Sequence, residues 1–300
     1  MPVGNAPQYF LKDSIYTRIT REIVADLEHG VAPWVRPWGG TASALPHNAA
    51  TGHSYRGINH LLLGMRCCSQ GFASNGWITF RQAMKLGGKV RRGERGTSVV
   101  YYQPIDPEAN DEGSVSSVGS SRAVLRVFTV FNLDQVEGLE ALIPDVSGDI
   151  PWEPYKAADD VIERSGADIR HRGGAAFYSP ATDRIVLPMR SAFGTADGYY
   201  ATALHELSHW TGHASRLSRQ ISGTFGSEDY AFEELVAEIS SAFLCAHCAI
   251  QGQLQHSSYI ASWIKVLNDD HRAIFRAASQ AQHAADYLLG TAPAAQSLAA

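Results

Sequence analysis

His205-Glu206-Leu207-Ser208-His209 is the stretch that decides how the C-terminal half of this 300-residue chain folds. Histidines four positions apart lie one turn apart on one face of a helix, close enough to share a metal ion. The glutamate between them projects beside that face, where it can take a proton from a metal-bound water. The stretch therefore predicts a helix over residues 198–211 that carries a catalytic zinc site of the metallopeptidase type.

A catalytic zinc site also needs a third protein ligand and one open position. His213 is the nearest candidate, but it follows His205 by eight residues, which is about 12 Å along a continuous helix. The pattern H-E-x-x-H-x-x-G-x-x-H is met at Gly212 and fails at Ser215, where it requires a third histidine. The acidic residues are therefore the better candidates.

A second helix, expected over residues 228–249, offers those acidic candidates. Its spacing Glu234-x-x-Ala237-Glu238 resembles the E-x-x-A-[D/N] segment that supplies the third ligand in gluzincin-type peptidases. We predict that Glu234 joins the two histidines as a zinc ligand. Glu238 is predicted to accept a hydrogen bond from a histidine N–H and so orient the ring. Glu233 is the fallback ligand.

Further roles in amide hydrolysis are assigned from position in the chain. Glu206 would act first as general base and then as general acid. In such folds the strand before the zinc helix pairs with extended substrate, and residues 183–188 fit that edge-strand role. The group that stabilises the oxyanion should be a tyrosine or a histidine, and the candidates are Tyr178, Tyr230 and His213.

Charge is distributed unevenly along the chain. Residues 34–105 hold nine Lys/Arg and one acid, Glu94, a net charge of +8, whereas residues 106–300 hold 13 basic and 25 acidic residues, a net charge of −12. Aromatic residues among the basic ones favour single-stranded nucleic acid, because unpaired bases can stack on their rings. The candidate contacts are Trp34, Arg36, Trp38, Arg56, Trp77, Arg81, Lys85, Lys89, Arg91, Arg92 and Arg95.

Hydrophobic periodicity predicts a mixed protein with two domains. Helices are expected over residues 9–29, 58–70, 79–86, 155–164, 256–270 and 271–289, and strands over 99–103, 124–131, 175–178 and 184–187. The last two strands read as a hairpin. The acidic, Pro-containing stretch 138–154 is the expected boundary between a domain of residues 1–140 and a domain of residues 151–290. The fold class is therefore α/β, of the α+β kind.

Composition excludes several classes of protein. No apolar run approaches the roughly 20 residues needed to cross a bilayer, so no membrane partner is expected. The first residues do not follow the pattern of a secretory signal. Four cysteines are few for a secreted protein of this size, which indicates free thiols in the cytoplasm. Cys245-x-x-Cys248 would be half of a metal site, but the chain has no second such pair.

Both halves together resemble the ArdC-type antirestriction proteins, which conjugative plasmids and other mobile elements encode. The segments that carry the resemblance are NGWITF (75–80), GGKVRRGERGT (87–97), VFTVFN (127–132), QVEGL (135–139), HELSHWTG (205–212) and EELVAE (233–238). The resemblance implies an N-terminal domain that binds single-stranded DNA and a C-terminal zincin domain that holds Zn²⁺. It also implies a role in protecting incoming plasmid DNA from host restriction endonucleases. A restriction endonuclease subunit or another protein would then be the partner or substrate.

Two other function classes stay open at this point. In the first, the zinc site is structural or degenerate, and the protein coats DNA or occupies a restriction enzyme without catalysis. In the second, a toxin-type or regulatory protease uses its basic half to recognise protein. Salt-dependent binding to single-stranded DNA separates this protease from the other readings. A Glu206 variant separates an enzyme from a non-enzymatic antirestriction protein.

Overall fold

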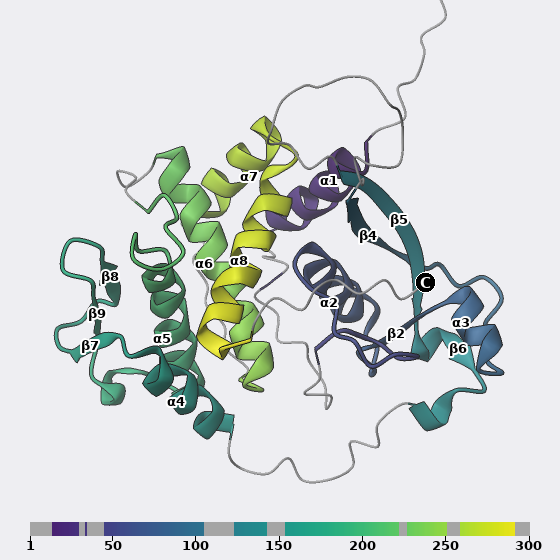
Figure 1. The fold of residues 1–300 in the computed structure, drawn as a ribbon, viewed down its shortest axis with the longest axis horizontal. Helices are drawn as coiled ribbons and strands as arrows, with labels where there is room; N and C mark the ends of the chain where they lie inside the picture. The colour runs from purple at the N-terminus through teal and green to yellow at the C-terminus, as the bar shows by residue number, and fades with distance from the viewer. Residues whose placement is uncertain are drawn as a thin grey trace, which may run out of the picture.

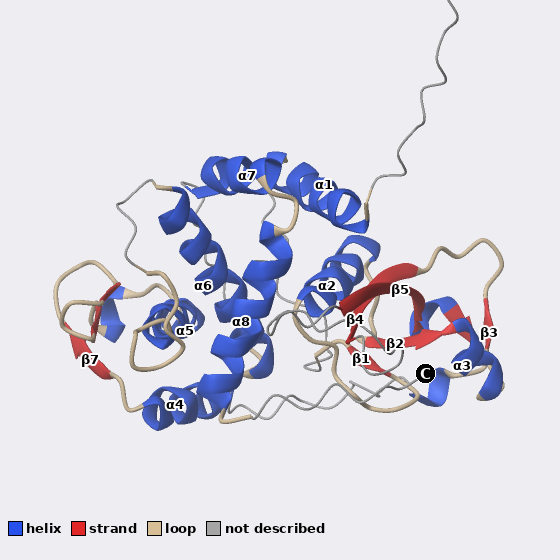
Figure 2. Cartoon of the chain, turned by 45° about the horizontal axis from the view of Figure 1, so that its top comes forward, coloured by secondary structure: helices blue, strands red, loops and turns tan. Residues whose placement is uncertain are grey.

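The computed structural model describes residues 14–29, 34, 45–104, 123–142, 154–221, 227–250 and 259–291. Helices and sheets are mixed, as the sequence predicts, and the expected α+β class is confirmed. A four-stranded sheet and a three-stranded sheet lie at opposite ends of the molecule, with the helices α6 (Glu228–His247) and α8 (Ala273–Leu289) between them (Figure 1, Figure 2).

The N-terminal part builds the larger sheet. Its elements are α1 (Ile15–Glu28), β1 (His47–Asn48), α2 (Ile58–Gln70), β2 (Gly76–Thr79), α3 (Phe80–Lys85), β3 (Lys89–Val90), β4 (Thr97–Pro104), β5 (Ala123–Asn132) and β6 (Val136–Glu137). The strand order is β1-β2-β5-β4, while β3 and β6 form a separate two-stranded ribbon. Thr79 and Gln82 form a capping box that starts α3 directly at the end of β2. Helix α3, which carries Arg81 and Lys85, therefore follows β2 without an intervening loop.

The C-terminal part builds the smaller sheet and most of the helices. Its elements are α4 (Pro154–Ser165), β7 (Asp168–His171), β8 (Phe177–Ser179), β9 (Arg184–Leu187), α5 (Ala196–Thr211), α6, α7 (Ile260–Asp269) and α8. The predicted hairpin is confirmed, because β8 pairs antiparallel with β9.

The edge-strand role predicted for residues 183–188 is wrong. Strand β7, which was not predicted, pairs parallel with the other side of β9, so β9 is the central strand in the order β7-β9-β8. Burial of Ile185, Val186 and Leu187 agrees with a central position. The edges of this sheet are β7 and β8, and Phe177 in β8 is 46 % exposed.

One hydrophobic core joins the N-terminal helices to the C-terminal ones. Buried residues of α1 and α2 belong to the same cluster as those of α5 to α8. Trp34 packs edge-to-face on Trp263 with ring centroids 5.4 Å apart. The Thr20 hydroxyl donates to the carbonyl of His271 over 2.7 Å. The described parts of residues 1–140 and 151–290 therefore share one core. The boundary predicted between them divides the chain in sequence but does not separate two cores.

Cys67, Cys245 and Cys248 are buried, and the last two are free thiols. Burial raises the pKa of Cys245 to about 12 and that of Cys248 to about 11, so neither is a ready thiolate ligand. In the described part of the chain, no helix is both long and apolar enough to span a bilayer.

Candidate metal centre

The helix α5 carries the H-E-x-x-H stretch into the core. Its N-cap is Thr195, whose side chain accepts a hydrogen bond from the backbone N–H of Gly198. From there the helix is buried on several sides, so that His205 is 3 % exposed and Glu206 is 7 % exposed. The two histidines are therefore not solvated residues on the surface of the helix.

Helix α6 packs beside α5 and presents its acidic residues to those histidines. Ser227 caps its first turn. Its apolar residues Leu235, Val236 and Ile239 are fully buried. Glu234 is also buried, at 6 % exposure, because it faces α5 and not solvent.

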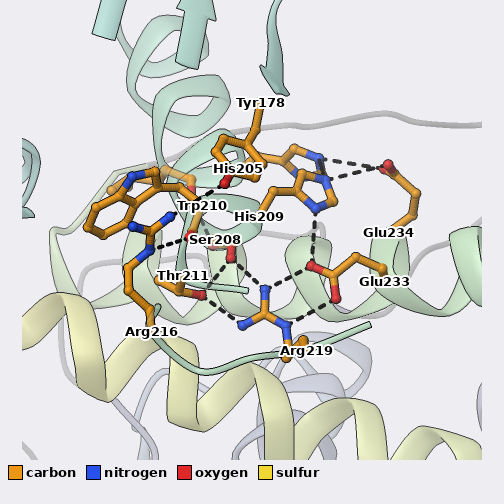
Figure 3. A network of polar contacts seen from close by, with 11 residues as sticks. Tyr178, His205, Ser208, His209, Trp210, Thr211, Arg216, Arg219, Glu233 and Glu234 are labelled. Carbon is orange, nitrogen blue, oxygen red and sulfur yellow. Dashed lines mark hydrogen bonds and ion pairs between the residues drawn. The ribbon is translucent and has the colours of Figure 1, made fainter. Parts of the chain in front are cut away.

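Three donor atoms from these two helices converge (Figure 3). The Nε2 atoms of His205 and His209 lie 3.2 Å apart. Oε2 of Glu234 lies 3.6 Å from Nε2 of His205, and its Oε1 lies 3.4 Å from Nε2 of His209. Ligand atoms about 2.0 to 2.1 Å from a tetrahedral zinc ion are separated by roughly 3.3 Å. The donor set therefore fits a zinc ion, and within the described residues it is the one such group.

The electrostatics of the cluster favour a cation. Burial alone lowers the pKa of His209, but the carboxylates of Glu233 and Glu234 outweigh burial and raise it to about 10. Burial raises the pKa of Glu234, yet its contacts with both histidines hold that pKa well below the usual range. The buried carboxylates thus stabilise a positive charge at this site. A divalent metal ion would supply that charge directly.

Glu233 is placed to orient His209, a role of the kind predicted for Glu238. Oε1 of Glu233 lies 3.2 Å from Nδ1 of His209, the ring nitrogen that faces away from the cluster. Glu233 is therefore a carboxylate behind the ring and not the fallback ligand. Glu238 is 2 % exposed in the next turn of α6, and its predicted hydrogen bond to a histidine stays a prediction.

Two tyrosines stand close to the acidic cluster. The hydroxyls of Tyr230 and Tyr259 lie 3.1 Å apart. Burial raises the pKa of Tyr230, and the partner hydroxyl and the Glu234 carboxylate raise it further. Burial also raises the pKa of Tyr259, where the fields of Glu234 and Glu206 add to the effect. Sequence reasoning missed Tyr259, because it lies far along the chain and precedes a helix without any motif.

The other oxyanion candidates are engaged elsewhere. The Tyr178 hydroxyl donates to Oδ1 of Asp183 over 2.9 Å. Nδ1 of His213 lies 2.8 Å from Oγ of Ser215, and His213 is not part of the convergent donor group. Tyr230 is therefore the one of the three candidates that the structure places beside a predicted ligand.

The residues predicted to bind nucleic acid divide into four groups. Arg36 and Trp38 lie outside the described residues. The stacking role expected for Trp34 and Trp77 is wrong, because both rings are buried in the core, at 1 % and 0 % exposure. Arg56 forms an ion pair with Asp286 on α8, which ties it to the protein.

The remaining basic candidates share one short segment. Arg81, Lys85, Lys89, Arg91, Arg92 and Arg95 are all exposed on α3, β3 and the loop that follows. Phe80 and Met84 on α3 are 51 % and 62 % exposed in the same segment. Arg91 also contacts Glu94 and the Asp134 carbonyl. We call these six basic residues and Phe80 the basic face.

Comparisons with known proteins divide the chain in a similar way. A model of a zincin-like metallopeptidase family, MPTase-PolyVal, matches residues 156–280. A model of the N-terminal domain of anti-restriction factor ArdC matches residues 13–131. The uncharacterized protein y4eC of Sinorhizobium fredii is 39 % identical over 281 residues, which is 91 % of each chain.

Larger proteins and solved structures are similar as well. A DNA primase TraC of Escherichia coli is 40 % identical over 294 residues, which is 93 % of this chain and 20 % of the primase. The chain thus spans about a fifth of that relative's length. The crystal structure of the Mn(II)-bound antirestriction ArdC protein from plasmid R388 matches with a TM-score of 0.76 and 38 % identity, over 95 % of this chain and 100 % of that one. Its metal-free form matches with a TM-score of 0.74.

Proposed function

Because this chain belongs to the ArdC family of antirestriction proteins, we propose that it binds single-stranded DNA and carries a zinc metallopeptidase-type centre. Its role would be to protect incoming plasmid DNA from host restriction endonucleases in the cytoplasm. The observation that carries the proposal is the convergence of His205, His209 and Glu234 within 4.8 Å of one another. We assign DNA binding to residues 1–140 and the metal centre to residues 151–290.

The metal would be held by the two imidazoles and the Glu234 carboxylate. Nitrogen ligands favour zinc over calcium or magnesium, which prefer oxygen ligands. A bound zinc ion would act as a Lewis acid and would lower the pKa of a water molecule that it contacts. The Mn(II) found in the R388 relative is compatible with the same mixed donor set.

The chain's own residues would handle the protons of amide hydrolysis. Glu206, next to His205 in α5, would accept a proton from the attacking water and then donate it to the leaving amine. The Tyr230 and Tyr259 hydroxyls would donate hydrogen bonds to the oxygen on which negative charge develops. Their proximity to the carboxylate cluster supports this role.

Single-stranded DNA would lie on the basic face. Cationic side chains contact phosphates whatever the sequence, and an exposed ring such as Phe80 offers a stacking surface to an unpaired base. The acidic remainder of the chain would repel a polyanion, which limits the DNA path to this face.

The test is protection during DNA transfer. Unmodified plasmid DNA is conjugated into a restricting recipient, from donors that express wild type, Glu206→Gln or Glu163→Gln. Glu163 is an exposed glutamate of α4 and serves as the control. We expect wild type and Glu163→Gln to protect and Glu206→Gln to lose protection. Full protection by Glu206→Gln would mean that the protein protects DNA without catalysis, which is the non-enzymatic alternative.

A further inference from the structure

Arg219 forms a buried bridge behind the metal centre. It belongs to the segment Gly212–Ile221 that follows α5, and its side chain is 5 % exposed. Its guanidinium holds the Glu233 carboxylate with two hydrogen bonds, Nε to Oε2 over 3.0 Å and Nη2 to Oε1 over 2.8 Å. This fork geometry fixes the plane of the carboxylate (Figure 3).

The same guanidinium also holds the last turn of α5. Nη2 donates to the Ser208 carbonyl over 2.6 Å, and Nη1 donates to the Thr211 hydroxyl over 2.8 Å. Ser208 immediately precedes His209, and Glu233 immediately precedes Glu234. One side chain therefore joins the backbone beside one ligand to the carboxylate beside another.

Gly212 is explained by this bridge. A Cβ atom at Gly212 would lie 2.9 Å from Nη2 of Arg219 and 2.7 Å from Cγ2 of Ile221. The backbone there has φ −76° and ψ −9°, so its conformation does not require glycine. The glycine is needed for the close approach of Ile221 and of the guanidinium, and not for the H-E-x-x-H-x-x-G-x-x-H pattern that it partly matches.

Resting on the proposed metal centre, we infer that Arg219 is a positioning residue that acts on the metal through Glu233 and His209. Glu233 is buried close to Glu234, and without a cation beside it the two carboxylates would repel each other. Arg219 holds the Glu233 carboxylate in the position where it accepts the Nδ1–H of His209. That hydrogen bond leaves the Nε2 lone pair directed into the cluster.

Arg216 provides a matched control in the same segment. Its side chain is 8 % exposed, and it stacks on Trp210 with its guanidinium carbon 3.8 Å from the ring centroid. It pairs with Asp183 and also donates to Tyr178. Removing Arg216 thus breaks a comparable ion pair near the centre without touching Glu233 or His209.

The test measures zinc affinity of the full chain by competition with a chelator of known affinity, together with the visible absorption of the Co²⁺-loaded protein. We expect Arg219→Met to lower zinc affinity roughly 10- to 100-fold, as loss of an outer partner of a ligand does. The Co²⁺ bands should shift in this variant. Arg216→Met should bind both ions as wild type does.

Further variants test the path of the effect. Glu233→Gln should show a similar loss, and combining it with Arg219→Met should add little, because both act in one chain of contacts. Gly212→Ala should weaken binding in wild type and have a smaller effect in Arg219→Met, where the added methyl group meets Ile221 but no longer the guanidinium. Arg219→Lys should restore affinity only in part, since an ammonium cannot bridge all four contacts.

Two results would overturn the inference. One is wild-type affinity and spectrum in Arg219→Met, and the other is an equal loss in Arg216→Met, which would indicate general loosening of the segment. If Arg219→Met does not fold, unchanged affinity in both Arg219→Lys and Glu233→Gln overturns it instead. Failure of wild type to bind zinc would instead remove the proposed metal centre. That result is distinct from equal zinc binding by wild type and Arg219→Met, which overturns only the role of Arg219.

Discussion

Glu233 and Glu234, neighbours in α6, approach opposite nitrogen atoms of one imidazole ring. Oε1 of Glu233 lies 3.2 Å from Nδ1 of His209, and Oε1 of Glu234 lies 3.4 Å from Nε2. One carboxylate therefore stands on the metal side of the ring and the other behind it. Both carboxylates are buried, at 5 % and 6 % exposure, so neither faces solvent.

The two tyrosines beside the cluster should affect turnover and not metal retention. Tyr259→Phe and Tyr230→Phe remove only a hydroxyl, so the rings still pack, with Tyr259 against Trp263. If the hydroxyls stabilise the oxyanion, loss of the one that does so should lower kcat on a peptide substrate about 10²- to 10³-fold. Zinc content should stay that of wild type. Unchanged kcat in both variants would remove this role.

The basic face should account for the electrostatic part of DNA binding. Lys89→Glu/Arg92→Glu reverses two exposed charges there, and Arg164→Glu/Arg172→Glu reverses two exposed charges in the acidic half. We expect the first pair to weaken binding to single-stranded DNA and to lower the salt slope by about one for each phosphate that is no longer neutralised. Fluorescence anisotropy at several salt concentrations measures both. Equal effects of the two pairs would place the DNA elsewhere.

A substitution at Trp34 should act on stability and not on stacking. The ring is 1 % exposed and packs on Trp263. Trp34→Ala should lower the free energy of unfolding by roughly 3–5 kcal/mol, the usual cost of emptying a large aromatic site. Denaturant unfolding measures this change. A variant as stable as wild type that binds DNA weakly would return Trp34 to the DNA interface.

His60 should make the fold sensitive to acid. It is 2 % exposed and stacks on Phe243 of α6 with centroids 4.2 Å apart. Burial lowers its pKa to about 3, whereas in the unfolded chain a histidine titrates near 6.5. Between these values the unfolded chain binds the extra proton, so stability falls as the pH falls, by up to about 1.4 kcal/mol per pH unit.

His60→Leu, which carries no titrating group, should flatten that dependence by as much as one proton. The measurement is the slope of the unfolding free energy against pH between about pH 4 and 6, inside the window set by the two pKa values. An identical slope in wild type and His60→Leu would mean that other groups cause the acid sensitivity.

Local pattern was sufficient for much of the fold and for the two ligand helices. The strong periodicity of residues 58–70 predicted α2 with the bounds that the structure has. The i, i+4 spacing of His205 and His209 set their relative placement, because a helix fixes it. Glu234 could be chosen from a motif, since it lies on a single well-marked helix.

What the sequence could not supply were contacts between distant segments. The short strand β7 has no alternating pattern of its own and is defined by its pairing with β9. From the sequence alone, Arg219 would be assigned to the solvated surface. Its burial depends on the contact between the segment after α5 and helix α6. Trp34 and Trp77 lie among basic residues in the chain, but burial is decided by tertiary packing that composition does not report.

Metal content of the purified full-length protein tests the central claim most directly. By mass spectrometry, wild type should hold about one zinc per chain, as three protein ligands and an open position imply. His205→Ala, His209→Ala and Glu234→Ala should each lose it, whereas Glu206→Gln should retain it. Full zinc in Glu234→Ala, with loss in the two histidine variants, would contradict the ligand set proposed for this centre.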